Sequence, residues 1–208
     1  MIVFPDISPE IFAINLFGLE LALRWYAVSY IVGFIIALRI IKFYIDRESF
    51  WQFIGAPMNR DQADSLITYL ILGVLIGGRL GYVIFYNFSY YANEPVEVLK
   101  VWDGGMSFHG GFVGVIISYV LFVRKNNLRF WSGADLIALA SPPGIFLGRI
   151  ANFINNELWG KPTTQPWGVI FPGARAQDCP EFTGLCARHP SQLYEAGLEG
   201  LLLFLILV

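Results

Sequence analysis

Charged residues are scarce in this sequence, at 14% of 208 residues, whereas a soluble domain carries about 25%. Basic charge is not in excess either, since 14 lysines and arginines face 16 aspartates and glutamates. A nucleic-acid binder that depends on a basic face is therefore excluded. Hydrophobic residues make up 56% and aromatic residues 16%, which excludes a disordered chain. Too little polar material remains to cover a soluble core, and the composition indicates an integral membrane protein.

Cysteine is also sparse: only Cys179 and Cys186 are present, close together in a polar stretch. The pair could form a disulfide if that stretch lies outside the cytoplasm, or it could remain two unlinked thiols. No spacing suggests a zinc site, and we expect no metal. The first eleven residues have no basic side chain and contain Pro5 and Pro9, so they do not resemble a cleavable signal peptide.

Several apolar stretches approach the roughly 20 residues that a helix needs to cross a bilayer. Four complete spans and one partial span run over Leu16–Ile41, Leu66–Tyr86, Met106–Val123, Ala134–Arg149 and Gln192–Val208. Pro142, Pro143 and Gly144 predict a bend or break inside the fourth span. The fifth span has no polar stop, so we expect one or more C-terminal helices to be missing. The predicted fold is an all-α polytopic membrane protein with about five visible transmembrane helices.

Lysine and arginine are distributed unevenly between the predicted loops, which predicts an orientation. The loops after the first and third spans hold Arg39, Lys42, Arg47, Arg60, Arg124, Lys125 and Arg129. The first 15 residues hold none, and 87–105 holds only Lys100. We therefore predict an extracytoplasmic N-terminus and three regions: membrane helices and loops over 1–149, an extracytoplasmic polar subdomain over 150–190, and an incomplete helix over 191–208.

Glycines recur at a spacing of four in two of the predicted spans. They are Gly73, Gly77 and Gly81 in the second span, and Gly110 and Gly114 in the third. Small residues at this spacing let helices approach closely. The pattern favours packing within the chain over a dimer interface.

Four ionisable side chains lie within or at the ends of the predicted spans: Arg24, Arg79, His109 and Arg149. At about 1.5 Å per residue, Arg24 lies roughly 12 Å and Arg79 roughly 10 Å from the outer ends of their helices. Arg24 could instead pair with Glu20, and Arg79 could snorkel to the headgroups. Together the four predict a cationic pocket open to the outer leaflet, because arginine binds phosphate with a planar fork of donors.

The stretch Gly148–Glu157 is polar where the fourth span meets water. If helical geometry continues past Arg149, then Arg149, Asn152 and Asn156 share one face. A second polar stretch, Asp103–Gly111, places His109 among glycines, where it could accept a proton from a weak acid.

Five stretches spread over nearly the whole chain form a recognisable set. They are Arg24-Trp25-Tyr26, Gly77–Tyr82, Trp102–Gly111, Gly148–Glu157 followed by Gly160, and His189–Glu195. The fourth follows the pattern G-R-x-x-N-F-x-N-x-E. In these stretches the sequence resembles the prolipoprotein diacylglyceryl transferases of bacterial inner membranes. Members of that family continue through a further helix with another functional arginine, which this sequence lacks.

The resemblance implies a reaction, the first step of bacterial lipoprotein maturation. The diacylglyceryl group of phosphatidylglycerol passes to the lipobox cysteine thiol at the signal-peptide junction of a prolipoprotein. A thioether forms and glycerol 1-phosphate is released. The implied partners are phosphatidylglycerol, the prolipoprotein and membrane lipids, without nucleic acid, and no cofactor is expected. The implied location is the bacterial cytoplasmic (inner) membrane.

The residues then receive predicted roles. His109 accepts or relays the thiol proton, because little of a cysteine is thiolate at neutral pH. Arg149, with Asn152 positioning it, holds the phosphate and stabilises the leaving group. The remaining predicted site residues are Arg24, Arg79 and Asn156, which bind phosphatidylglycerol, and Tyr26, which donates a hydrogen bond in catalysis.

Two other functions fit parts of the pattern. Intramembrane arginines and broken helices also mark transporters of anionic solutes or lipids. However, transporters tend to have repeated halves and sites near the midplane, whereas these polar groups are one-sided. A structural membrane subunit would have no need for the polar stretches.

Overall fold

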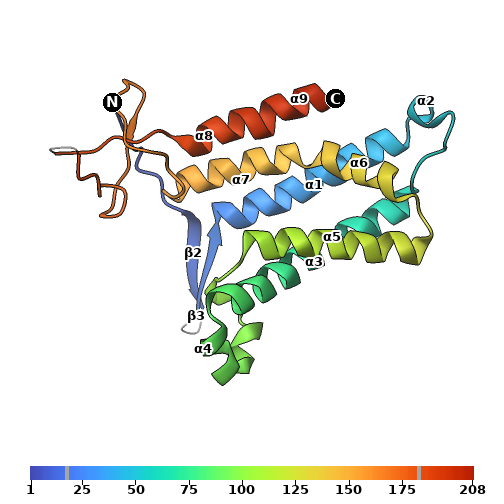
Figure 1. The fold of residues 1–208 in the computed structure, drawn as a ribbon, viewed down its shortest axis with the longest axis horizontal. Helices are drawn as coiled ribbons and strands as arrows, with labels where there is room; N and C mark the ends of the chain where they lie inside the picture. The colour runs from blue at the N-terminus through green and yellow to red at the C-terminus, as the bar shows by residue number, and fades with distance from the viewer. Residues whose placement is uncertain (17–18, 182–183) are drawn as a thin grey trace. The chain divides into compact units, whose positions relative to one another are not determined.

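The structure, a computed structural model, describes residues 1–16, 19–181 and 184–208, the side chains of residues 16, 19–21 and 103 excepted. The chain forms two compact units, Met1–Ile40 with Ile137–Val208, and Ile41–Leu136. Within the described residues, four helical segments are long and apolar enough to cross a membrane: Trp25–Ile45, Arg60–Tyr86, Phe108–Asn126 and Phe130–Ile154. The chain is therefore a mostly helical, multi-pass membrane protein, as predicted (Figure 1).

The unit Ile41–Leu136 is built around an antiparallel pair of long helices, α3 and α5. Its elements are α2 (Glu48–Trp51), α3 (Arg60–Tyr86), α4 (Phe88–Asn93), the 3₁₀ turns η1 (Pro95–Leu99) and η2 (Val101–Asp103), α5 (Phe108–Asn126) and the start of α6 (Phe130–Ala140). The glycines of α3 pack directly on those of α5: a Cβ at Gly77 or Gly81 would collide with Gly110. The prediction of packing within the chain is confirmed.

The other unit contains most of α1 (Trp25–Ile45), then α7 (Pro142–Ile154) and the last helix. The last helix runs through α8 (Ser191–Glu195), a π-helical stretch η3 (Ala196–Leu202) and α9 (Leu203–Leu207). Gly33 of α1 lies against Gly144, where an added Cβ would come within 3.2 Å of the Gly144 Cα. Gly200 lies against Phe146 of α7. Small residues thus bring both neighbours close to α7, which Figure 1 shows between α1 and the last helix.

A small non-helical subdomain follows α7, and the start of the chain joins it. Strand β1 (Ile2–Val3) pairs in parallel with β4 (Val169–Ile170). Phe4 packs on Phe153 and Phe171, with ring centroids 5.2 and 5.4 Å away. The N-terminus and the 150–190 region therefore lie on the same side of α7.

Two devices hold this subdomain together without regular secondary structure. Arg188 donates hydrogen bonds to the carbonyls of Ala176, Gly160 and Asp178, at 2.6, 3.3 and 2.8 Å. Cys179 and Cys186 form a disulfide, so of the two states that the sequence left open the structure contains the bonded one. Covalent closure compensates for a small apolar core.

The predicted first span is wrong at its beginning. Residues before Trp25 form an antiparallel hairpin of β2 (Glu10–Leu16) and β3 (Leu19–Arg24), with Leu16 opposite Leu19 and Glu10 opposite Arg24. β2 contains β-branched and aromatic residues, and pairing satisfies the backbone groups of both strands. The helix therefore begins at Trp25, not at Leu16.

The other spans shift less. The third span, α5, begins at Phe108, two residues after the predicted Met106, because the Ser107 side chain caps the helix by accepting a hydrogen bond from the Gly110 N–H. The predicted interruption of the fourth span lies at Ser141, between α6 and α7. Ser141 forms a bend between the two helices, although its dihedral angles stay helical (φ −75°, ψ −39°). Helical geometry continues past Arg149 to Ile154, as the sequence required for its polar face.

Candidate functional site

The start of α1 and the end of α7 together hold a hydrogen-bonded cluster of three polar side chains. The Tyr26 hydroxyl donates to Oε1 of Glu157. Asn152 donates its Nδ2 to the Tyr26 hydroxyl oxygen and to the same Glu157 oxygen, the latter at 2.9 Å. Asn152 is buried, and Tyr26 and Glu157 are partly buried. The structure thus joins two predicted site residues through a carboxylate.

The turn that carries Glu157 is strained. Its neighbours Asn156 and Leu158 have φ values of 54° and 56°, in the left-handed region that a leucine rarely adopts. Each such residue costs on the order of 1–3 kcal/mol and persists only where its surroundings hold it. Here the Glu157 N–H donates to the Asn152 carbonyl at 3.1 Å, and Nε2 of the fully buried Gln192 donates to the Glu157 carbonyl. The fold is therefore braced to present this one carboxylate.

Arg149 lies one helical turn before Asn152 and points to the last helix. Its Nε lies 2.9 Å from Glu195 Oε2, and its Nη2 lies 3.5 Å from Glu199 Oε2. Glu199 lies in the π-helical stretch η3, a local geometry often found at functional sites, and Glu195 is the last residue of α8, directly before it. Two carboxylates against one guanidinium leave a net negative charge, so the cationic pocket that the sequence predicts is not cationic at Arg149.

Arg24 does not lie inside a helix. It is the last residue of β3, and its side chain is 63% exposed, with Nη2 3.3 Å from Glu10 Oε1 across the hairpin. The predicted depth of Arg24 is wrong because the helix begins one residue later. The alternative partner Glu20 has a side chain outside the described part. Arg24 and Arg149 thus have different carboxylate partners.

Arg79 is buried, and its guanidinium is occupied by the backbone of the chain that follows α3. Nε donates to the Val98 carbonyl at 2.9 Å. The other nitrogens donate to the carbonyls of Glu97, Lys100, Gly104 and Gly105. The structure gives Arg79 the role of holding this connection on α3. Its part in lipid binding stays a prediction.

His109 is the second residue of α5 and is exposed, with its ring edge-on to Phe108 at 5.7 Å. It belongs to the unit Ile41–Leu136, whereas Tyr26, Arg149 and Asn152 belong to the other unit. A proton-accepting role requires access, which its exposure provides.

Asn156 does not share the helix face of Arg149 and Asn152. The helix ends at Ile154, and the left-handed backbone of Asn156 turns its side chain toward the subdomain. Its Nδ2 donates to the Pro172 carbonyl at 2.8 Å. The expected shared face is therefore correct for two residues and wrong for the third.

Sequence reasoning missed the carboxylates of the site. Glu157 stood in the quoted motif but received no role, and Glu195 and Glu199 were not considered as partners of Arg149. A signal was present, because acidic residues four apart in an apolar helix require a partner in the membrane. Gln192 gave no such signal, since its role depends on a distant carbonyl.

Comparison with known proteins gives one consistent result. The family model described as "Prolipoprotein diacylglyceryl transferase" matches residues 12–208. A relative from Cereibacter sphaeroides (strain ATCC 17029) is 59% identical over 204 residues, which are 98% of this chain and 70% of the relative. Relatives from Roseobacter denitrificans and from Rhizobium leguminosarum bv. trifolii are 54% and 46% identical, over 99% and 98% of this chain and 70% and 68% of their own lengths.

All three relatives are named phosphatidylglycerol–prolipoprotein diacylglyceryl transferase. The match includes the helices that carry Tyr26, Arg149 and Glu195, and it confirms the resemblance drawn from the five stretches. By its sequence and by its membrane-helical fold, the chain belongs to the prolipoprotein diacylglyceryl transferase family.

Proposed function

We propose that this chain transfers the diacylglyceryl group of phosphatidylglycerol to the lipobox cysteine of a prolipoprotein. Family membership supports the reaction class, and the names of the relatives supply the lipid and the protein substrate. The observation that carries the proposal is the placement of Arg149 one turn from the braced Tyr26–Asn152–Glu157 cluster. An anion-binding group and a hydrogen-bonding cluster on one helix end suit a charged headgroup.

The transfer is a substitution at carbon. The cysteine sulfur forms a bond to the terminal glyceryl carbon, and the bond from that carbon to the phosphate oxygen breaks. The electron pair stays on the phosphate, which leaves as glycerol 1-phosphate. The thiol proton must be removed, since a free cysteine has a pKa of about 8.5. His109 is our proposed acceptor of this proton.

Arg149 binds the phosphate by exchanging one anion for another. Glu199 makes the longer contact, 3.5 Å, and its side chain is 53% exposed, whereas Glu195 is held at 2.9 Å. The phosphate therefore replaces Glu199, while Glu195 keeps the guanidinium oriented. Charge that develops on the leaving phosphate is then stabilised at a fixed donor.

The cluster beside Arg149 orients the substrate. Asn152 and Glu157 fix the position of the Tyr26 hydroxyl, which donates its single proton to Glu157 and donates to the substrate only when the substrate takes the place of that carboxylate. We keep Arg24, Arg79 and Asn156 as lesser contributors to the lipid site, through charge at Arg24 and through the backbone that Arg79 and Asn156 hold.

We place the chain in the bacterial cytoplasmic membrane with its N-terminus outside. A disulfide within 150–190 supports an oxidising side for that region. The pairing of β1 with β4 supports the same side for the N-terminus. The basic residues of the loops support the opposite side for Arg47 and Arg124. The division into 1–149, 150–190 and 191–208 belongs to this proposal.

The test uses the chain in vesicles that contain phosphatidylglycerol, with a peptide that includes a lipobox cysteine. We expect release of glycerol 1-phosphate and a peptide mass increased by one diacylglyceryl group. Arg149→Ala should abolish both while the protein remains inserted, and Arg175→Ala, at an exposed arginine of the subdomain, should not.

Three outcomes would contradict parts of this scheme. Normal turnover by Arg149→Ala would remove the phosphate site. Unimpaired turnover by His109→Gln would remove the base and leave the phosphate site standing. Flux of an anionic solute without any product would indicate a transporter.

A further inference from the structure

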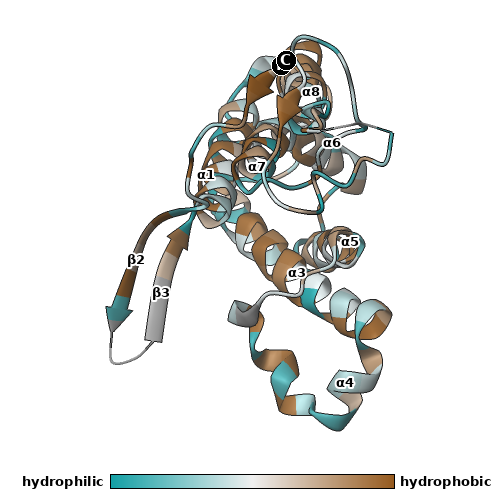
Figure 2. Cartoon of the chain, turned by 90° about the vertical axis from the view of Figure 1, so that its left-hand side faces the viewer, coloured by the Kyte–Doolittle hydropathy of each residue, from teal (hydrophilic) through white to brown (hydrophobic). Residues whose placement is uncertain are grey.

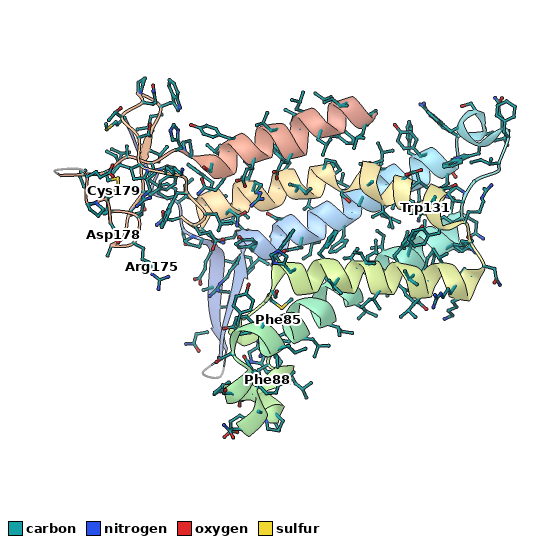
Figure 3. The ribbon with its side chains drawn as sticks, in the orientation of Figure 1. Phe85, Phe88, Trp131, Arg175, Asp178 and Cys179 are labelled. Carbon is teal, nitrogen blue, oxygen red and sulfur yellow. A yellow bond between two sulfur atoms is a disulfide. The ribbon has the colours of Figure 1, made fainter. Side chains whose placement is uncertain are left out.

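The end of α3 and the connection from α3 to α5 expose several large apolar side chains, which together we call the interfacial patch. It consists of Phe85, Tyr86, Phe88, Val96, Leu99 and Trp102. Phe85 is 80% exposed, Leu99 73% and Trp102 75%. Figure 3 labels Phe85 and Phe88 where α3 passes into α4. Apolar patches of this kind mark contact with a partner or with lipid.

The buried Arg79 fixes where this connection lies along α3. Its guanidinium donates to five carbonyls between Glu97 and Gly105, which lie 18 to 26 residues later in the chain. Gly105 has a φ of 76° and lies so close to α3 that a Cβ there would meet the Tyr82 ring. The chain therefore folds back along the end of α3 and does not extend away from it.

The packing of α3 on α5 sets the level of the connection relative to a bilayer. Gly81 of α3 lies against Gly110, in the first turn of α5. α5 has 19 residues, so it is about 28 Å long and matches a hydrocarbon core of about 30 Å. Arg79 and the carbonyls that it binds are therefore level with the end of the span, at the boundary between hydrocarbon and headgroups.

The chemistry of the connection fits that boundary. Tryptophan and tyrosine concentrate at membrane interfaces, where their rings are half apolar and half polar. Polar and apolar positions lie side by side along α4 (Figure 2). The charges offer no basic surface, since Glu94 is exposed and the Lys100 ammonium lies 2.5 Å from Glu97 Oε1. Electrostatic attraction to anionic headgroups therefore does not hold this connection at the membrane interface.

We propose that the interfacial patch inserts into the headgroup region of the bilayer and contacts lipid at this end of α3 and α5. The occupant of the surface is the lipid itself, because the patch continues the exposed apolar faces of two membrane-spanning helices. Apolar burial drives the insertion, so it does not depend on the headgroup charge.

The test measures depth with a spin label attached to cysteine. Cys179 and Cys186 are bonded to each other, so an introduced cysteine provides the free thiol. Leu99→Cys and Trp102→Cys report on the patch. Ile117→Cys, at an exposed position in the middle of α5, is the hydrocarbon control, and Arg175→Cys is the water control.

Collision with oxygen and with a water-soluble nickel chelate gives the depth of each label in the intact chain in vesicles. We expect Leu99→Cys and Trp102→Cys to lie between the two controls, within about 5–10 Å of the headgroup boundary. The depth should be the same in phosphatidylcholine vesicles and in vesicles that also contain phosphatidylglycerol.

Each other outcome overturns the proposal. Nickel accessibility equal to that of Arg175→Cys would place the patch in water. Low accessibility to both reagents would mean that protein covers it, and the same loss only on addition of a lipobox peptide would make it a peptide-docking surface. Insertion only with phosphatidylglycerol would indicate a headgroup site.

Discussion

The roles of Arg79, Arg149 and Arg188 follow from the groups that each guanidinium contacts. Arg79 and Arg188 donate to backbone carbonyls, which cannot be given up without unfolding the segments that carry them. Arg149 contacts carboxylates, which another anion can replace. Arginine forks suit both carboxylate and phosphate. At the residue scale, Arg149 is therefore the exchangeable cation of the three.

The two carboxylates of Arg149 should behave differently when each is neutralised. Glu199→Gln removes the weaker, more exposed contact, which is worth at most about 1 kcal/mol. We expect the KM for phosphatidylglycerol to fall a few-fold, with kcat within about twofold of its original value. Glu195→Gln removes the contact that orients the guanidinium, and kcat should fall by about tenfold or more. Steady-state assays over a range of lipid concentrations separate these effects.

The same two variants, Glu199→Gln and Glu195→Gln, can also contradict these different roles. Equal changes in KM for both variants would show that the carboxylates only neutralise charge. A drop in the temperature of unfolding for both, with unchanged kinetics in the folded fraction, would give them a structural role alone.

At the scale of elements, the glycines that pack α3 on α5 determine how closely the two helices approach. We call them the glycine seam: Gly73, Gly77, Gly81, Gly110 and Gly114. A Cβ at Gly77 would collide with the Gly110 carbonyl and lie 2.8 Å from the Gly114 Cα. Gly77→Val should therefore separate the helices and lower the stability by about 1–3 kcal/mol. Ile76→Phe, which adds bulk at an exposed position one residue earlier, should leave the unfolding temperature unchanged. Thermal unfolding in detergent measures both, and equal shifts would contradict the role of the seam.

Some elements of the fold could be predicted from the sequence, and others could not. Long apolar helices were predictable because their hydrophobicity is local, and so was the seam, because its period is fixed by the helix. The β2–β3 hairpin was missed because its pairing depends on residues that also suit an apolar helix. The turn after α7 was missed because Asn156 and Leu158 take a left-handed backbone without being glycines. Partners supplied by another element, such as Gln192 for Glu157, cannot be deduced from spacing.

At the scale of the whole molecule, the chain contains its own markers of sidedness. The pairing of Ile2–Val3 with Val169–Ile170 puts the N-terminus and the subdomain on one side. The disulfide lies in that subdomain, and disulfides persist in oxidising compartments. Arg47 lies in the connection between α1 and α3, Arg60 begins α3 and Arg124 lies in the last turn of α5, at helix ends that the positive-inside rule assigns to the cytoplasm. Covalent chemistry and charge distribution thus support the same orientation independently.

This orientation predicts a labelling pattern in spheroplasts of a bacterium that expresses the chain. Because Cys179 and Cys186 are bonded to each other, an impermeant maleimide should label Arg175→Cys, at an exposed position of the subdomain, without permeabilisation. The matched control carries Gln52→Cys, at an exposed position between Arg47 and Arg60. That cysteine should be labelled only after permeabilisation, because the basic loop stays on the cytoplasmic side. The opposite pattern in the two proteins would reverse the chain in the membrane, and with it the leaflet from which Arg149 takes its lipid.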